Sequence, residues 1–115
     1  MSFRGGKARA YTPAKTAHAE AAVRYLLAAN GAQMYPRDIP LSVRMTFWLV
    51  RPQSAPRRRI WPVTKPDNDN LQKLVSDAAE SYLWEADQQI VRIFAEKRYC
   101  PDGVAPHILL EVEPL

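Results

Sequence analysis

The middle of the chain carries acidic and basic side chains at spacings that suit metal and phosphate chemistry. Asp67 and Asp69 lie two residues apart, and Lys73 follows Asp69 by four residues. Asp77 stands four residues beyond Lys73, and Asp87 ten residues beyond Asp77. Carboxylate oxygens are the ligands that hard divalent cations prefer, and a lysine ammonium pairs with phosphate oxygens as a compact positive charge. These residue types therefore predict a site for a divalent metal and a phosphate, provided that the fold brings them together.

A structural interpretation of the same residues competes with this one. Asp69 could be the N-cap of a helix, with Gln72 three residues later completing a capping box. For a single aspartate, capping is the commoner role. It leaves the rest of the pattern unexplained, because intervals of four place Asp69, Lys73 and Asp77 along one side of the helix, away from its apolar side. Asp87 can lie near these three residues only if the conformation of the segment after the helix brings it there.

Periodicity and turn residues predict five regular elements. In chain order these are a helix between Thr12 and Gly31, a strand over 41–50, a helix from Asp69 to about Tyr82, a strand over 90–99 and a strand over 107–113. The first helix is bounded by a Thr-Pro start and an Asn-Gly stop, and the first strand alternates between apolar and polar residues. The second helix is expected to bury the apolar residues at helical intervals, which are Leu71, Leu74, Val75, Ala78 and Tyr82.

The order of these elements predicts a small α+β fold. Pro101, Asp102 and Gly103 form a turn signal between the last two strands, which should run antiparallel to each other. At 115 residues the chain has room for one hydrophobic core. We therefore expect a single domain over residues 1–115, with two helices packed on a mixed β-sheet of three to four strands.

Charge is divided unevenly between the two halves of the chain. Residues 1–60 hold eleven of the sixteen Lys and Arg residues and two acids, whereas residues 61–115 hold five bases and ten acids. A polyanionic partner such as DNA accounts for the basic half, because each Lys or Arg set against a phosphate releases counterions. The alternative is a solvated surface on which charge is unevenly distributed without a binding role. The candidate DNA-binding residues are Lys7, Arg9, Arg57, Arg58, Arg59, Lys65 and Lys73.

The proline-containing segment over 51–65 carries three consecutive arginines and Trp61, and it predicts an irregular basic arm. Trp61 could stack on an unpaired base near a DNA crossover, or it could anchor the arm to the body of the protein. Trp48, on the polar face of its strand, is expected at a dimer contact or under the arm. Phe47 and Trp84 are expected in the core.

Composition excludes several other kinds of protein. Cys100 is the only cysteine, so no intrachain disulfide forms, and a reducing cytoplasm suits the chain better than an extracellular space. No apolar segment is long enough to span a bilayer. An EF-hand starting at Asp67 fails, because Gln72 stands where glycine is required and Ala78 where a bidentate glutamate is needed. One cysteine and two distant histidines are a poor set of ligands for zinc, so magnesium or manganese is the expected metal.

A longer motif surrounds the acidic residues. It comprises Lys65-Pro66-Asp67-x-Asp69-Asn70-Leu71-x-Lys73, then Asp77-Ala78, then Trp84-x-x-Asp87-x-Gln89-Ile90, and later Lys97. This pattern covers 33 residues and resembles the signature of the RusA family of Holliday junction resolvases, which are crossover junction endodeoxyribonucleases. The order of elements around the motif also agrees with the family, as does the basic stretch that leads into Tyr11-Thr12-Pro13. Elsewhere the similarity is weaker.

The resemblance implies a Mg²⁺-dependent homodimeric endonuclease, with Mn²⁺ as a possible substitute, that makes paired symmetric nicks in four-way DNA junctions during recombination and repair. It also implies a cytoplasmic protein encoded by a bacterium or a phage. By motif position, Asp67, Asp69 and Asp87 would be catalytic metal-binding carboxylates, and Lys73 would be the catalytic lysine. A non-catalytic, structure-specific DNA-binding protein and a nuclease for other branched DNA are the alternatives. The acids count against a pure binder, because they repel phosphate unless a cation intervenes.

Two departures from the family pattern bear on this expectation. The family usually has two acids before the Gln-Ile step, whereas this chain has Ala86 at the first of those positions, which leaves Glu85 or Asp77 as the possible fourth carboxylate. Family members also usually open with a β-strand and a proline-rich turn. This chain begins near the basic segment that would follow, Arg4 to Arg9, so the sheet is expected to lack a strand.

Overall fold

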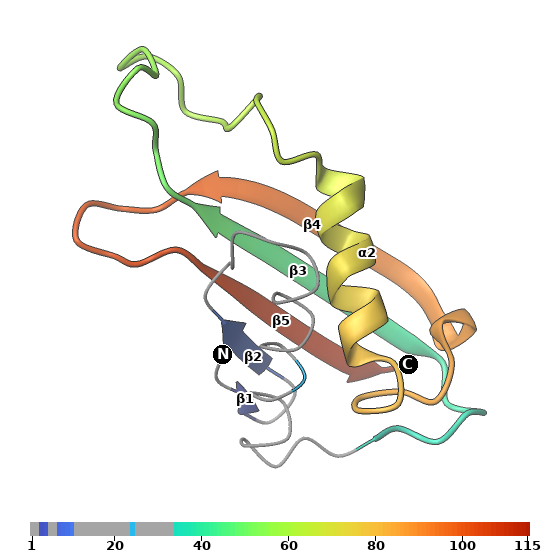
Figure 1. Cartoon of the computed structure of the whole chain (residues 1–115). Coiled ribbons are helices and arrows are strands. Elements are labelled where there is room, and N and C mark those ends of the chain that lie inside the picture. Colours follow the sequence, from blue (N-terminus) through green and yellow to red (C-terminus); the bar gives the residue numbers. More distant parts are fainter. Residues whose placement is uncertain (1–2, 5–6, 11–23, 25–33) are drawn as a thin grey trace.

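A mixed β-sheet forms the centre of the fold (Figure 1). The computed structural model describes residues 3–4, 7–10, 24 and 34–115. The strands are β1 (Phe3–Arg4), β2 (Lys7–Ala10), β3 (Leu41–Leu49), β4 (Ile90–Tyr99) and β5 (His107–Pro114), in the order β1-β2-β5-β3-β4. β3 is parallel to β4, and the other neighbouring pairs are antiparallel. The predicted mixed sheet and its three long strands are therefore confirmed.

The N-terminal segment contributes two short strands that the sequence did not indicate. The sheet thus has five strands rather than three to four, and the expectation that it lacks a strand usual in the family stays a prediction. β2 pairs with β5, with Ala8 opposite Leu110. Lys and Ala are weak strand formers, but backbone hydrogen bonds to the edge of β5 form whatever the side chains are. The predicted first helix lies outside the described residues, apart from Arg24, which is helical.

The last two strands run antiparallel to each other, as predicted, but they are not neighbours. β3 lies between β4 and β5. The connection over residues 100–106 is long enough to cross one intervening strand, which widens the gap by about 4.8 Å. Because β3 and β4 are parallel, the chain must return along the sheet between them, and α2 (Asn68–Ala79) lies in that return. This connection carries almost all of the acidic motif.

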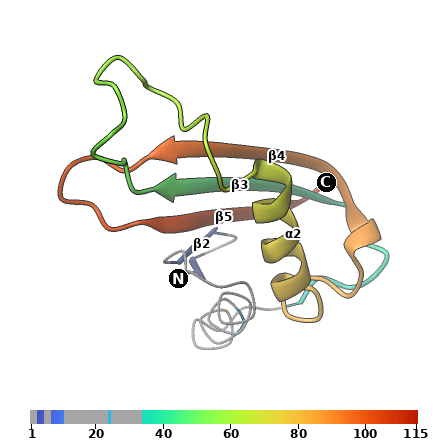
Figure 2. The same ribbon diagram turned by 45° about the horizontal axis from the view of Figure 1, so that its top comes forward.

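The core lies between α2 and the face of the sheet that α2 covers (Figure 2). The alternating apolar residues of β3 line it, and the register sets Val43 opposite Val112 and Met45 opposite Leu110 on β5. Phe47 has no exposed surface, as expected. The other face of the sheet carries the polar residues of the same strands. β3 and β5 therefore separate a buried apolar face from a face open to ligands, whereas the outer strand β4 has no buried residue.

The end of α2 differs from the sequence prediction. Its buried residues include Leu71, Leu74, Val75 and Ala78, which the helical periodicity predicted. Tyr82 is 37% exposed, contrary to expectation, because the helix ends at Ala79 and Ser81 turns the chain with a φ of 71°. Leu83 and Trp84 follow this turn with no exposed surface, and they belong to the core.

Candidate active site

Asp67 and Asp69 lie at the start of α2, and both are exposed. The helix begins at Asn68 with Asp67 as its N-cap, so the proposed Asp69 cap with a Gln72 capping box is wrong. The Asp67 side chain makes no capping hydrogen bond, and the Gln72 amide Nε2 donates to Asn68 Oδ1 at 2.9 Å instead. Neither aspartate is needed to cap the helix. The structural interpretation therefore loses its main support, and two exposed carboxylates remain at one end of α2.

The start of α2 is fixed to β4 by hydrogen bonds. Lys97 Nζ donates to the backbone carbonyls of Thr64 and Pro66, at 2.7 and 2.9 Å. Asn68 Nδ2 donates to the carbonyl of Ala95 at 3.1 Å. These bonds hold the segment on both sides of Asp67 against the edge strand. Lys97 belongs to the sequence motif, and its contacts give it a structural role: it fixes the backbone that leads into Asp67.

Lys73 and Asp77 are exposed on α2 beyond its first turn. Lys73 lies one helical turn after Asp69, so both side chains are near enough to act on a ligand at the start of α2. Asp77 lies eight residues after Asp69, which is about 12 Å along a helix. The Asp77 carbonyl accepts a hydrogen bond from Arg24 Nη2 at 3.4 Å. As the possible fourth carboxylate, Asp77 is therefore well separated along the helix from Asp67 and Asp69.

Asp87 lies at the opposite end of α2. It opens a short 3-10 helix, η1 (Asp87–Gln89), directly before β4. Its backbone N–H donates to Glu80 Oε2 at 3.3 Å, and Glu80 is the C-cap of α2. The buried Trp84 indole donates from Nε1 to Asp87 Oδ1 at 2.7 Å and holds the carboxylate. Since the 12 residues of α2 span about 18 Å, Asp87 cannot lie beside Asp67 in the same copy of the chain.

The described carboxylates thus form two separate groups. Within residues 34–115 and the short described N-terminal pieces, no three His, Cys, Asp or Glu side chains lie close enough to hold a metal ion. Asp67 and Asp69 make one group with Lys73. Asp87 makes the other with Glu80, a residue that the sequence analysis did not consider. Glu85, the alternative fourth carboxylate, lies near Asp87 in sequence and pairs with Arg37 at 3.3 Å.

Gln89 fixes the backbone around Asp87. Its side chain is 4% exposed and makes four hydrogen bonds. Oε1 accepts from the N–H groups of Glu85 and Ala86, and Nε2 donates to the carbonyls of Pro36 and Ile39. The glutamine of the motif is therefore structural. Ala86 takes part through its backbone N–H, so the departure from the family pattern at this position leaves the local fold intact.

We expect Gln89→Ala to lower the free energy of unfolding by about 2–4 kcal/mol, because it removes four hydrogen bonds and leaves partly buried backbone groups without these partners. Urea denaturation followed by circular dichroism measures this change. The exposed neighbour provides the matched control, since Gln88→Ala should stay within about 0.5 kcal/mol of the wild type. Equal stability of the two variants would show that the Gln89 hydrogen bonds do not support the Asp87 turn.

The basic arm over 51–65 is held in place by Arg51. Arg51 Nη1 donates to the carbonyl of Arg59 at 2.7 Å and Nη2 to that of Pro56 at 2.5 Å. Arg57 and Arg58 are exposed between these points, whereas Arg59 is half-buried. Of the other candidate DNA-binding residues, Lys65 is exposed just before Asp67, and β2 holds Lys7 and Arg9 opposite Glu111 and Leu109 of β5.

Aromatic and arginine side chains gather where the arm meets the sheet. Arg98 lies over the rings of both Trp48 and Trp61, and Trp48 stacks with His107. Trp48 is half-buried on the open face, as the polar alternation of β3 implies. The sequence analysis singled out both tryptophans but missed Arg98 and His107. The register of three strands brings Arg98 and His107 to Trp48, and no local sequence pattern predicts that register.

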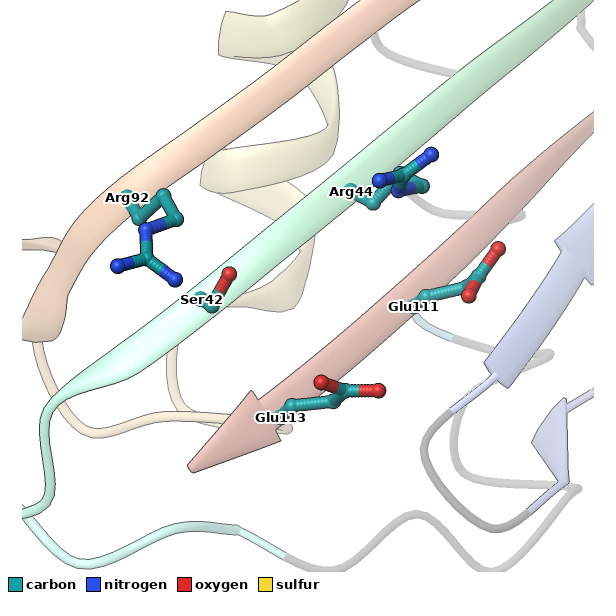
Figure 3. Close-up of a pocket in the computed structure, with 5 residues that line it drawn as sticks. All are labelled: Ser42, Arg44, Arg92, Glu111 and Glu113. Carbon is teal, nitrogen blue, oxygen red and sulfur yellow. The ribbon is translucent and has the colours of Figure 1, made fainter. Parts of the chain in front are cut away.

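A pocket of about 350 Å³ lies elsewhere on the open face of the sheet (Figure 3). It is lined by Ser42, Arg44, Arg92, Glu111 and Glu113, which come from β3, β4 and β5. Arg44 also lies 4.7 Å from the centre of the Phe94 ring. The pocket contains side chains of both signs and none of the motif residues.

Cys100 directly follows β4. Burial raises the pKa of its thiol and favours the neutral form.

Comparison with known proteins identifies the family. The family model described as Endodeoxyribonuclease RusA matches residues 1–113, almost the whole chain. The chain belongs to the RusA family. RusA proteins are endodeoxyribonucleases that resolve Holliday junctions, so this chain is a phosphodiester hydrolase of that class. RusA-family nucleases depend on a divalent metal and act on branched DNA junctions.

Two negative findings accompany the RusA assignment. None of the curated proteins matches the chain. Among the described residues, no helix is long and apolar enough to cross a membrane.

Proposed function

We propose that the chain is a single RusA-like domain over residues 1–115 that resolves four-way DNA junctions by paired symmetric nicks with Mg²⁺, in DNA recombination and repair. The observation that carries this proposal is the pair of exposed carboxylates at the start of α2, neither of them needed to cap the helix. Asp67 and Asp69 bind the metal, and Lys73 contacts the phosphate. Asp87 completes the carboxylate set.

The donor chemistry of these residues fits Mg²⁺. This ion is commonly held in proteins by one or two carboxylates, with water and substrate phosphate oxygens as further ligands. Asp67 and Asp69 supply two carboxylates in the first turn of α2. When bound there, Mg²⁺ would activate a water molecule and neutralise charge on the phosphate. Mn²⁺ accepts the same oxygen ligands.

The protein's own groups favour a phosphate at the same end of the helix. The first N–H groups of α2 have no partner within the helix, and the helix dipole attracts negative charge to them. Lys73, one turn inside the helix, adds a full positive charge that stabilises the charge developing on the phosphate during cleavage. Lys65, exposed just before Asp67, extends the positive surface along the DNA backbone.

A homodimer resolves the separation of the carboxylates. Asp87 lies at the far end of α2 from Asp67, so a two-fold partner that brings its own Asp87 to the Asp67 end would complete each site. The outer strand β4 offers an apolar edge for such a partner, because Val91, Ile93 and Phe94 are 62%, 45% and 48% exposed, with Ile93 and Phe94 on opposite faces of the sheet. Paired sites related by a two-fold axis suit a junction that is itself nearly two-fold symmetric.

The proposal is tested by incubating the purified protein with a labelled four-way junction and with a linear duplex of the same sequence, each with Mg²⁺ or with EDTA. Paired cuts at symmetric positions in the junction, only with Mg²⁺, are expected. Cleavage of the linear duplex alone would overturn the resolvase assignment. Flap and three-way substrates, run alongside, test the alternative of a nuclease for other branched DNA.

The basic arm should account for much of the salt-dependent affinity. Replacing Arg57, Arg58 and Arg59 together by alanine is expected to weaken junction binding and to lower the slope of log Kd against log salt by up to about 3, since each phosphate contact contributes about 0.9. Titrations at several salt concentrations in EDTA measure both quantities. An unchanged affinity would show that the arm does not contact DNA.

A further inference from the structure

Four side chains form a continuous stack on the open face of the sheet, in the order Trp61, Arg98, Trp48, His107. The Arg98 guanidinium carbon lies 5.1 Å from the centre of the Trp61 ring and 5.7 Å from that of Trp48. The rings of Trp48 and His107 are 5.9 Å apart and inclined by 21°. Three flat aromatic groups and one flat cation therefore lie in series. We call these four residues the aromatic ladder.

The sheet holds three members of the ladder at fixed spacing. Trp48 on β3 is opposite Arg98 on β4 and opposite His107 on β5. Glu96 Oε1 accepts a hydrogen bond from Arg98 Nε at 3.0 Å and orients the guanidinium. His107 Nδ1 lies 2.8 Å from the Ala105 carbonyl. These contacts favour the stacked arrangement in the absence of a ligand, which lowers the entropy lost on binding.

Trp61 is the outer member of the ladder and comes from the arm. It is 49% exposed although Arg98 covers part of its ring. Arg57 and Arg58, a few residues before it, are exposed cations that suit a DNA backbone. A flat aromatic surface beside phosphate-binding cations is how proteins hold unpaired nucleotides, because every base offers a face for stacking. A base within a duplex is already stacked on both faces and is not available.

We propose that the aromatic ladder binds an unpaired nucleobase at the branch point of the DNA, stacked on the exposed part of Trp61. This inference rests on the proposed action on branched DNA. Asp67 follows Trp61 by six residues, a distance of at most about 22 Å, and Lys97 holds the chain between them against β4. At about 3.4 Å per nucleotide along a strand, the bound base lies within roughly six nucleotides of the phosphate at Asp67.

The test is a mutant cycle between protein and DNA, measured as equilibrium binding in EDTA so that cleavage plays no part. One change is Trp61→Ala, and the other is an abasic site in place of each branch-point nucleotide in turn. Each change alone should weaken junction binding about 5- to 100-fold at one of these positions. Both together should weaken it no further than either alone, because the two changes remove the same contact. Trp61→Tyr should restore most of the affinity.

Additive effects at every position would overturn the proposal, since they would mean that Trp61 only anchors the arm. The matched control is Ile60→Ala, which alters the neighbouring side chain, 74% exposed, and should change neither affinity nor coupling. Coupling without any nuclease activity in Mg²⁺ would keep the ladder and reject the proposed function. Cleavage without coupling would reject the ladder and keep the proposed function. Failure to bind the junction at all would also reject the ladder.

Discussion

Asp67→Asn is expected to lower the rate of junction cleavage by at least about 10²- to 10³-fold, while junction binding is retained or becomes tighter. The change keeps the shape of the side chain and removes one negative charge from the start of α2, where the charge is proposed to hold Mg²⁺. Losing one such electrostatic contact to the transition state typically has an effect of this size. Binding is retained because the asparagine no longer repels the phosphate. Asp69→Asn should behave in the same way.

Single-turnover cleavage with Mg²⁺ and equilibrium binding in EDTA separate the two effects. Asp102→Asn makes the same change of charge in the exposed turn after β4 and should cut normally. Since the Asp67 side chain makes no capping hydrogen bond, the stability of Asp67→Asn should stay close to that of the wild type. An Asp67→Asn protein that cleaves at the wild-type rate would remove this residue from the mechanism.

A mixed dimer of Asp67→Asn and Asp87→Asn chains is expected to regain activity that neither variant has alone. If each site takes Asp67 from one copy and Asp87 from the other, the mixed dimer holds one intact site and one site lacking both residues. It should nick junctions at about half the wild-type rate per dimer and should not resolve them by paired cuts. Co-expression with two different affinity tags, followed by purification on both, gives this dimer for a nicking assay.

The reciprocal mixture is its control. A chain carrying both Asp67→Asn and Asp87→Asn, paired with a wild-type chain, has no intact shared site and should be inactive. If all carboxylates of a site came from one copy, the two mixtures would exchange their results. Failure to recover any protein on both tags would reject the homodimer itself. The experiment thus tests directly whether a partner overcomes the separation imposed by the length of α2.

Local patterns in the sequence predicted much of the fold because each depends on neighbouring residues. The alternation of β3 and the helical spacing of Leu71, Leu74, Val75 and Ala78 were confirmed, since both follow directly from the geometry of strand and helix. The prediction that Tyr82 is buried was wrong because Ser81 adopts a left-handed backbone conformation, which its residue type does not indicate. β1 and β2 were missed because the backbone edge of β5 holds them, and their side chains carry no strand signal.

The sequence by itself determined the family to which the chain belongs and the residue types of the proposed site, its carboxylates and its lysine. Only the tertiary structure decided how these residues are arranged. It separates Asp87 from Asp67 by the length of α2, makes Gln89 and Lys97 positioning residues, and brings Arg98 and His107 to the tryptophans. Residue type and short spacing are properties of the local chain. Distances between segments depend on strand order and register, which arise from pairing between residues remote in sequence.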